Sequence, residues 1–256
     1  MRVALITGGM GGLGESISTK MHTAGYRVVV THSPGNTRAK DWLAEHSAAG
    51  RKFSAYGVDV ANFDSCNECV TCVAKDIGPI DILVNNAGIT KDTTFKKMSK
   101  ADWDAVIRTN LDSVFNMTKQ VMDGMTDRGW GRVINTASAH SLVASPFKSA
   151  YVAAKHGIAG LTKTVALELA QSRITCNCIS PGYVWTPLVE KQIPETMKAR
   201  NMREDQVIKD VLLAAQPTKE FVTVEQVASL ALFLCGEDAA QITGANLAVD
   251  GGWTAV

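Results

Sequence analysis

The stretch that decides the fold is Val3-Ala4-Leu5-Ile6-Thr7-Gly8-Gly9-Met10-Gly11-Gly12-Leu13-Gly14. Its apolar part, residues 3–7, predicts a buried strand, and the pattern of residues 13–24 predicts a helix directly after the glycines. Glycines let a backbone turn sharply and approach a pyrophosphate, and a helix N-terminus supplies unpaired N–H groups. A glycine loop between a strand and a helix therefore predicts a dinucleotide-binding site. Its spacing, Gly8-x3-Gly12-x-Gly14, is wider than G-x-G-x-x-G.

Apolar runs and amphipathic stretches alternate along the rest of the chain. Buried strands are predicted at residues 28–31, 53–59, 82–85, 132–136, 175–180 and 247–249. Helical patterns fill the gaps at residues 39–48, 64–77, 100–126, 150–170 and 224–235. This alternation indicates a parallel sheet covered by helices on both faces. We expect one α/β domain over residues 1–256, a doubly wound Rossmann-type fold with a seven-stranded parallel sheet.

The composition excludes several classes of protein. Hydrophobic residues make up 46% of the 256 residues, and the formal net charge is +1. This balance gives no electrostatic reason to expect nucleic acid or a membrane as a partner. No apolar run reaches the roughly 18 residues of a membrane span. Because the sequence enters a strand at once, we expect no signal peptide, a cytoplasmic protein and six free thiols.

Three cysteines are spaced as in some metal sites. Cys66, Cys69 and Cys72 form C-x-x-C-x-x-C, which superficially suggests a metal or an iron–sulfur cluster. They fall in a predicted helix, where positions i, i+3 and i+6 spread about one flank, and no fourth cysteine or nearby histidine completes a ligand set. We therefore expect structural cysteines and no metal.

Residues 187–223 break the alternation, because this stretch is charged and only loosely periodic. It follows a predicted strand end, where open α/β sheets bind ligands. A helical lid at this place would cover the site and exclude water. The alternative is a solvated pair of helices with no gating role.

Tyr151 and Lys155 lie four residues apart, so in a helix they share one face. An ammonium beside a phenol lowers the phenol's pKa from about 10 toward working pH. Such a phenol can pass a proton to or from an alcohol or ketone oxygen. Together with the glycine loop, this pair predicts an enzyme that transfers hydride.

These motifs resemble the short-chain dehydrogenase/reductase family over nearly the whole length. The resemblance rests on the glycine loop, Asn85-Asn86-Ala87-Gly88, Tyr151-x3-Lys155 and Pro181-Gly182. It implies one doubly wound domain, a homotetramer and catalysis without metal. In the implied catalytic set Tyr151 is the acid/base, Lys155 tunes it and holds the ribose, Ser138 binds the substrate oxygen, and Asn110 holds a water. The implied cofactor-binding residues are Thr7, Gly8, Gly12, Leu13, Gly14, Asp59, Val60, Asn86, Gly88, Tyr151, Lys155, Pro181, Val184 and Thr186.

The choice between NAD and NADP depends on the end of the second strand. NAD enzymes often carry an acid there for the ribose 2′-hydroxyl, but residues 30–38 contain no carboxylate. Arg38 could bind a 2′-phosphate or be an exposed charge at a helix start. We expect NAD, with Arg38 at the cofactor and with NADP left open.

The two halves of the chain resemble different members of the family. The first half, including residues 85–92, is similar to acetoacetyl-CoA reductases. The second half, including residues 148–157, 186–193 and 249–255, is similar to bacterial (R)-3-hydroxybutyrate dehydrogenases. The two groups differ in whether the substrate carries a free carboxylate.

A buried carboxylate needs a cation or hydrogen-bond donors. Lys148, Tyr151 and Lys155 can share one helix face, and His140 can point the same way from an extended strand end. By resemblance, Ser138, His140, Lys148, Tyr151, Gln192 and Trp253 bind the substrate. Alternatively, Lys148 is a surface lysine, Gln192 a solvated lid residue and Trp253 a subunit contact.

A free 3-hydroxy acid is therefore the expected substrate. The predicted reaction interconverts (R)-3-hydroxybutyrate and acetoacetate with a nicotinamide cofactor, and neither nucleic acid nor a membrane is expected as a partner. Thr90 stands where hydroxybutyrate dehydrogenases carry a glutamine, and with Asp92 it resembles the CoA reductases. The alternative is an NADPH-dependent acetoacetyl-CoA reductase. A cofactor sensor without turnover is disfavoured, because Asn110, Ser138, Tyr151 and Lys155 are all present.

Overall fold

A single parallel sheet of seven strands organises the molecule, in the order β3-β2-β1-β4-β5-β6-β7. The computed structural model describes residues 1–255; in helix α7 it describes the backbone but not the side chains of Pro187, Leu188, Lys191, Gln192, Glu195 and Ala199. The order reverses between β1 and β4, and ligands bind at such a switch point in open α/β sheets. The strands are β1 (Val3–Ile6), β2 (Arg27–His32), β3 (Phe53–Gly57), β4 (Ile80–Asn85), β5 (Gly131–Thr136), β6 (Ile174–Pro181) and β7 (Asn246–Val249).

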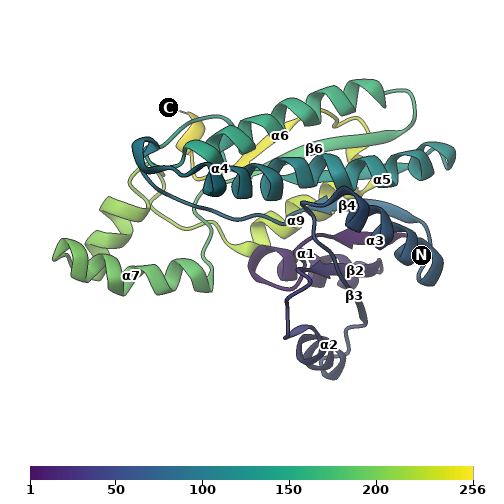
Figure 1. Cartoon of the computed structure of the whole chain (residues 1–256), viewed down its shortest axis with the longest axis horizontal. Helices are drawn as coiled ribbons and strands as arrows, with labels where there is room; N and C mark the ends of the chain where they lie inside the picture. Colours follow the sequence, from purple (N-terminus) through teal and green to yellow (C-terminus); the bar gives the residue numbers. More distant parts are fainter. Residues whose placement is uncertain (256) are drawn as a thin grey trace.

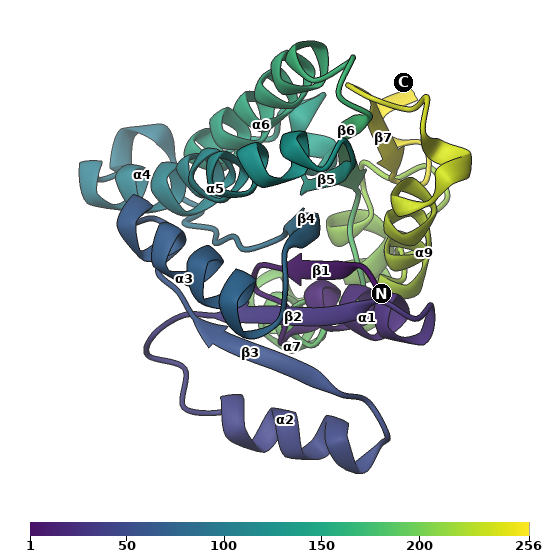
Figure 2. The same ribbon diagram turned by 90° about the vertical axis from the view of Figure 1, so that its right-hand side faces the viewer.

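Helices cover both faces of this sheet (Figures 1 and 2). Successive residues of a strand point to opposite faces, so Ala4 and Ile6 enter one core cluster while Val3 and Leu5 enter the other. The first cluster is completed by α1 (Gly12–Thr23), α2 (Ala39–Ala48) and α9 (Val224–Cys235). The second is completed by α3 (Phe63–Asp76), α5 (Ser113–Asp127) and α6 (Ser149–Glu168). The predicted doubly wound fold is confirmed.

One predicted helix, at residues 100–126, is interrupted. The structure has α4 (Lys100–Ile107), the π-helix η2 (Arg108–Asp112) and then α5. In η2 the buried Asn110 side chain binds both backbone groups of Ile89, and a π turn of this kind re-aims a side chain within a helical run. The 3.6-residue hydrophobic periodicity of the sequence gives no sign of this π turn.

The stretch between β6 and α9 is helical. It contains α7 (Pro187–Arg200), the short α8 (Glu204–Gln206) and the π-helix η4 (Val207–Leu212), and α7 stands away from the sheet in Figure 1. A bridge between Val184 and Val222 ties its two ends together, and the rings of Trp185 and Phe221 meet at 5.0 Å. No helix in residues 1–255 is both long and apolar enough to cross a membrane.

Candidate active site

The glycine loop closes tightly around the end of β1. Gly8 and Gly12 have φ values of +61° and +49°, a region that favours glycine. At Gly14 a Cβ atom would stand 2.3 Å from the carbonyl oxygen of Gly8, so only glycine lets α1 pack this closely. The Thr7 hydroxyl accepts the N–H groups of Asn86 and Ala87, at 2.9 and 3.0 Å, and so joins β1 to β4. Leu13 follows in the first turn of α1 and packs against the core.

A cavity of about 360 Å³ opens at the switch point beside this loop. Gly8, Asp59, Val60 and Gly88 line it, as expected of cofactor-binding residues. The wall also includes Thr31, His32 and Ser33 at the end of β2. None of these three was predicted to bind the cofactor, although they belong to the strand end on which the choice between NAD and NADP depends.

The structure places Arg38, which was predicted at the cofactor, at the start of α2. It is exposed at the N-cap of α2, its backbone N–H binds the Asn36 side chain, and it does not line this cavity. The described lining contains no lysine or arginine, and Asp59 is its one acidic residue. The described lining of the cavity therefore has no guanidinium or ammonium group that could bind a 2′-phosphate.

The opposite side of the glycine loop meets the start of α7. Thr186 caps α7 by accepting the N–H of Val189, and its methyl group would lie 3.9 Å from a Cβ atom on Gly12. Pro181 ends β6, and Val184 lies just before Thr186, in the bridge to Val222. Of these three predicted residues, Thr186 is the one that the structure places next to the glycine loop.

Ser138, His140 and Tyr151 meet above the end of β5. The ring of His140 lies edge-on to that of Tyr151 at 5.9 Å, and its Nδ1 is 3.3 Å from the Ser138 hydroxyl. His140 was expected on an extended strand end, but it lies in a single 3-10 turn, Ala139–Ser141, that Ser138 caps. Burial and the nearby Lys148 ammonium lower the pKa of His140 to about 4, so its ring is neutral at pH 7. A hydrogen bond joins Ser138 to Tyr151.

The expected effect of Lys155 on Tyr151 does not appear in the structure. Burial raises the pKa of Tyr151, and the hydrogen bond to Ser138 offsets this only partly. The Lys155 ammonium lies 5.4 Å from the ring centre and donates to the Thr136 carbonyl at 2.7 Å. Burial lowers the pKa of Lys155 itself to about 8. Tyr151 is therefore a phenol at neutral pH, the form that donates a proton to a ketone.

Asn110 stands behind this group on η2. Its carboxamide oxygen accepts the N–H of Ile89 at 2.8 Å, and its nitrogen donates to the Ile89 carbonyl at 2.9 Å. Gly88 packs against it, because a Cβ atom there would meet the Asn110 oxygen at 3.3 Å. Asn110 thus fixes the chain just after β4, where Ile89 lines the cavity of about 360 Å³.

Lys148 approaches Tyr151 from a second direction. It is the N-cap of α6 rather than a residue of the predicted helix face, yet its Nζ lies 5.7 Å from the Tyr151 ring centre. Lys148 also forms an ion pair with Asp92. The structure thus brings two ammonium groups to one phenol and gives one of them a carboxylate partner.

An aromatic row completes the site. Trp253 lies edge-on to His140 at 5.0 Å and stacks on Tyr183 at 5.8 Å. Trp253 was predicted to bind the substrate. Tyr183 was not predicted, although it directly follows Pro181-Gly182, which carries part of the family resemblance. The His140 ring also contacts Ser145 at 2.9 Å. The predicted Gln192 lies, as a side chain, outside the described residues.

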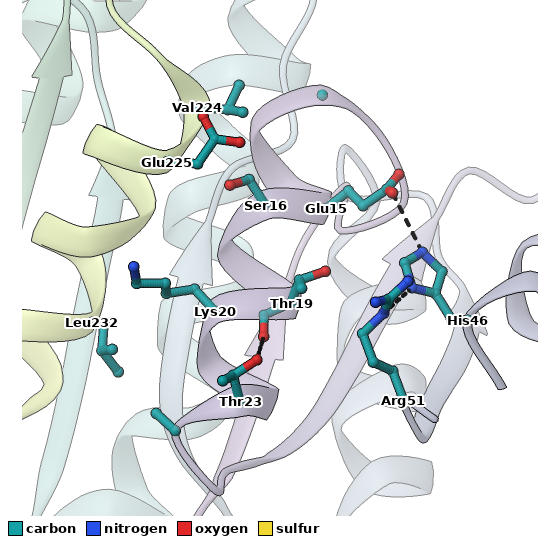
Figure 3. A pocket seen from close by; sticks show the side chains of 12 residues that line it. Glu15, Ser16, Thr19, Lys20, Thr23, His46, Arg51, Val224, Glu225 and Leu232 are labelled. Carbon is teal, nitrogen blue, oxygen red and sulfur yellow. Dashed lines mark hydrogen bonds and ion pairs between the residues drawn. The ribbon is translucent and has the colours of Figure 1, made fainter. Parts of the chain in front are cut away.

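Two other features do not join this centre. A cavity of about 570 Å³ lies between α1, α9 and the end of α2, where Glu15 pairs with His46 and His46 with Arg51 (Figure 3). In α3, Cys66 and Cys69 are buried in the core while Cys72 is exposed. Burial raises the pKa of Cys66 to about 12 and that of Cys69 to about 11, so both remain protonated thiols.

A family model described as short chain dehydrogenase matches residues 2–196. The chain is a short-chain dehydrogenase. The dehydrogenase is 48% identical to a D-beta-hydroxybutyrate dehydrogenase of Rhizobium meliloti, over 99% of each chain. It is 40% identical to an acetoacetyl-CoA reductase of Cupriavidus necator, over 98% of this chain and 97% of that one.

A solved structure has the same fold as this dehydrogenase. It is a variant of actinorhodin polyketide ketoreductase, crystallised with NADPH. The TM-score is 0.92 at 33% sequence identity, over 100% of this chain and 98% of that chain. The predicted family and the two predicted groups of relatives are confirmed.

Proposed function

We propose that this dehydrogenase interconverts (R)-3-hydroxybutyrate and acetoacetate with NAD. The observation that carries the proposal is the second ammonium at the phenol, Lys148, 5.7 Å from the Tyr151 ring. Acetoacetate carries a carboxylate close to the ketone that is reduced. A cation beside the proton donor fits such a substrate. The 48% identity to a D-beta-hydroxybutyrate dehydrogenase supports the same substrate.

The side chains divide the work of reduction. Tyr151, held as a phenol by burial, donates its proton to the ketone oxygen. Ser138, bonded to Tyr151, donates a second hydrogen bond to that oxygen as negative charge develops on it. Lys155 of α6, which donates to Thr136 at the end of β5, and Asn110 of η2, which holds Ile89, would keep this pair in place. The bound nicotinamide cofactor supplies or accepts the hydride.

Residues of the glycine loop and of the cavity beside it would hold the cofactor. The tight backbone at Gly8, Gly12 and Gly14 fits a pyrophosphate at the N-terminus of α1, and Asp59 and Val60 fit an adenosine in the 360 Å³ cavity. We infer NAD because the described lining carries no lysine or arginine for a 2′-phosphate.

Initial rates with four substrate pairs test this function. Acetoacetate and acetoacetyl-CoA are each assayed with NADH and with NADPH. We expect the highest kcat/KM for acetoacetate with NADH. A higher value for acetoacetyl-CoA would overturn the substrate, and a higher value with NADPH would overturn the cofactor.

A second candidate is acetoacetyl-CoA reductase. It is favoured by the Lys148–Asp92 pair, because the pair leaves no net charge for a substrate carboxylate. The 40% identity to an acetoacetyl-CoA reductase also supports it. The same four rates separate the two candidates.

We also infer that residues 187–223 form a lid and that the chain assembles as a homotetramer in the cytoplasm. The clamped ends at Val184 and Val222 support a hinged cover over the site. The outer faces of α5 and α6 expose Phe115 and Leu167, which fits contact with another subunit. Light scattering should give four times the 27.4 kDa chain mass.

A further inference from the structure

The ion pair between Lys148 and Asp92 joins two loops that are 56 residues apart in sequence. The Lys148 side chain is 21% exposed and that of Asp92 is 40% exposed, so the pair is partly shielded from water. Exposed pairs contribute little to stability, whereas shielded pairs interact more strongly.

Backbone contacts hold both loops in place. The N–H of Thr93, next to Asp92, donates to the carbonyl of Phe147, next to Lys148, at 2.9 Å. At the other end of the same loop, Asn110 binds both backbone groups of Ile89. A fixed loop therefore holds the Asp92 carboxylate next to Lys148, and no further ordering of the loop is needed when the ion pair forms.

The pair lies at the reacting end of the site. Its Lys148 Nζ lies 5.7 Å from the centre of the Tyr151 ring, so the ion pair is next to the group that handles the ketone. His140 is neutral at pH 7, and the Lys155 ammonium donates a hydrogen bond to the Thr136 carbonyl. Among the described residues around Tyr151, Lys148 is thus the cation left for a substrate carboxylate, and Asp92 already binds it.

We propose that Asp92 is a specificity-determining residue, an internal carboxylate that competes with the substrate's carboxylate for Lys148. A free 3-oxo acid must displace Asp92 or bind beside a pair without net charge. An uncharged 3-oxo ester or thioester has no such competition. Asp92 thus shifts selectivity away from free acids toward uncharged 3-oxo compounds, an inference that rests on the proposed function.

Asp92→Asn tests this with two ketones of similar size, acetoacetate and methyl acetoacetate. Freeing Lys148 should raise kcat/KM for acetoacetate about tenfold, the scale of a close charge interaction. The value for the uncharged ester should stay the same. A fall for both ketones would mean that Asp92 only holds its loop, and an unchanged ratio would mean that it does not compete; either result overturns the proposal.

Two further variants make the test specific. Asp102→Asn removes a carboxylate that pairs with Lys91 of the same loop at 3.6 Å, and it should leave the ratio unchanged. In a Lys148→Met background, Asp92→Asn should no longer alter the ratio. If it still does, the competition does not run through Lys148 and the proposal fails.

Binding of unreactive ligands separates this inference from the proposed function. Butyrate and butyramide have equal length and differ in charge, and calorimetry measures both against wild type and Asp92→Asn with NADH present. Butyrate should bind about tenfold more tightly to the variant, with butyramide unchanged. If neither oxo acid nor thioester is turned over, the proposed function fails while this comparison still decides the role of Asp92.

Discussion

The hydroxyl of Tyr151 is the proton donor in the proposed reduction. Tyr151→Phe keeps the ring that meets His140 and removes the proton donor. We expect kcat/KM for acetoacetate to fall by a factor of about 10² to 10⁴, the usual effect of losing a positioned acid. The Kd of NADH, measured by fluorescence titration, should not change. Tyr56→Phe is the control, since its hydroxyl binds Asp76 away from the site. A Tyr151→Phe enzyme with near-normal rate would remove Tyr151 from the proton path.

Individual residues differ in how far the sequence could predict them. Tyr151 and Lys155 are separated by one helical turn, so their proximity follows from local geometry. The pairing of Lys148 with Asp92 and the stacking of Tyr183 on Trp253 depend on loops that only the folded sheet brings together. The four-residue spacing shows that an ammonium is near Tyr151, but it does not show the burial that raises the pKa of Tyr151 in the structure.

Among the elements, η2 is one that periodicity could not predict. Asn110→Leu should leave both backbone groups of Ile89 without their partner, which costs about 2–4 kcal/mol in the free energy of unfolding. Because Ile89 also lines the cavity proposed for the cofactor, kcat/KM should fall as well. Urea denaturation and initial rates measure the two effects.

Asn177→Leu is the matched control for η2. Asn177 lies in β6 and is also buried. Its side chain binds two backbone groups, the carbonyl of Ile242 and the N–H of Ala245. We expect a similar loss of stability with the rate per folded molecule retained. Equal losses of rate in both variants would show that η2 has no particular role in the site.

The element α7 carries the lid prediction. If residues 187–223 close over bound ligands, trypsin should cut after exposed Lys198 or Arg200 more slowly with NADH and butyrate present than without them. Cleavage after exposed Lys52, far from α7, should keep its rate. Equal protection at both places would indicate general stabilisation, and no protection at α7 would favour the solvated helices.

For the whole molecule, the buried thiols predict how stability depends on pH. Burial raises the pKa of Cys66, Cys176 and Cys235 to about 12, and that of Cys69 and Cys178 to about 11, from 9.0 in the unfolded chain. Below pH 9 these groups are neutral in both states. Above pH 9 the unfolded chain loses protons that the folded protein keeps, so stability falls as the pH rises toward 11 or 12.

At pH 10 each thiol should lower the free energy of unfolding by about 1 kcal/mol, and the five together by several kcal/mol, a large share of the stability of a domain. Lys155 offsets part of this loss, because its pKa is lowered to about 8 and the folded state gains stability between pH 8 and its unfolded pKa of 10.5.

Urea denaturation at pH 8, 9 and 10 should therefore show a steep decline in the free energy of unfolding. Cys235→Ala should remove about one fifth of the part of that decline that the five thiols cause, whereas a Cys72→Ala control, which changes an exposed thiol, should not. A stability that is flat to pH 10 would mean that the core thiols ionise as easily inside the fold as in water.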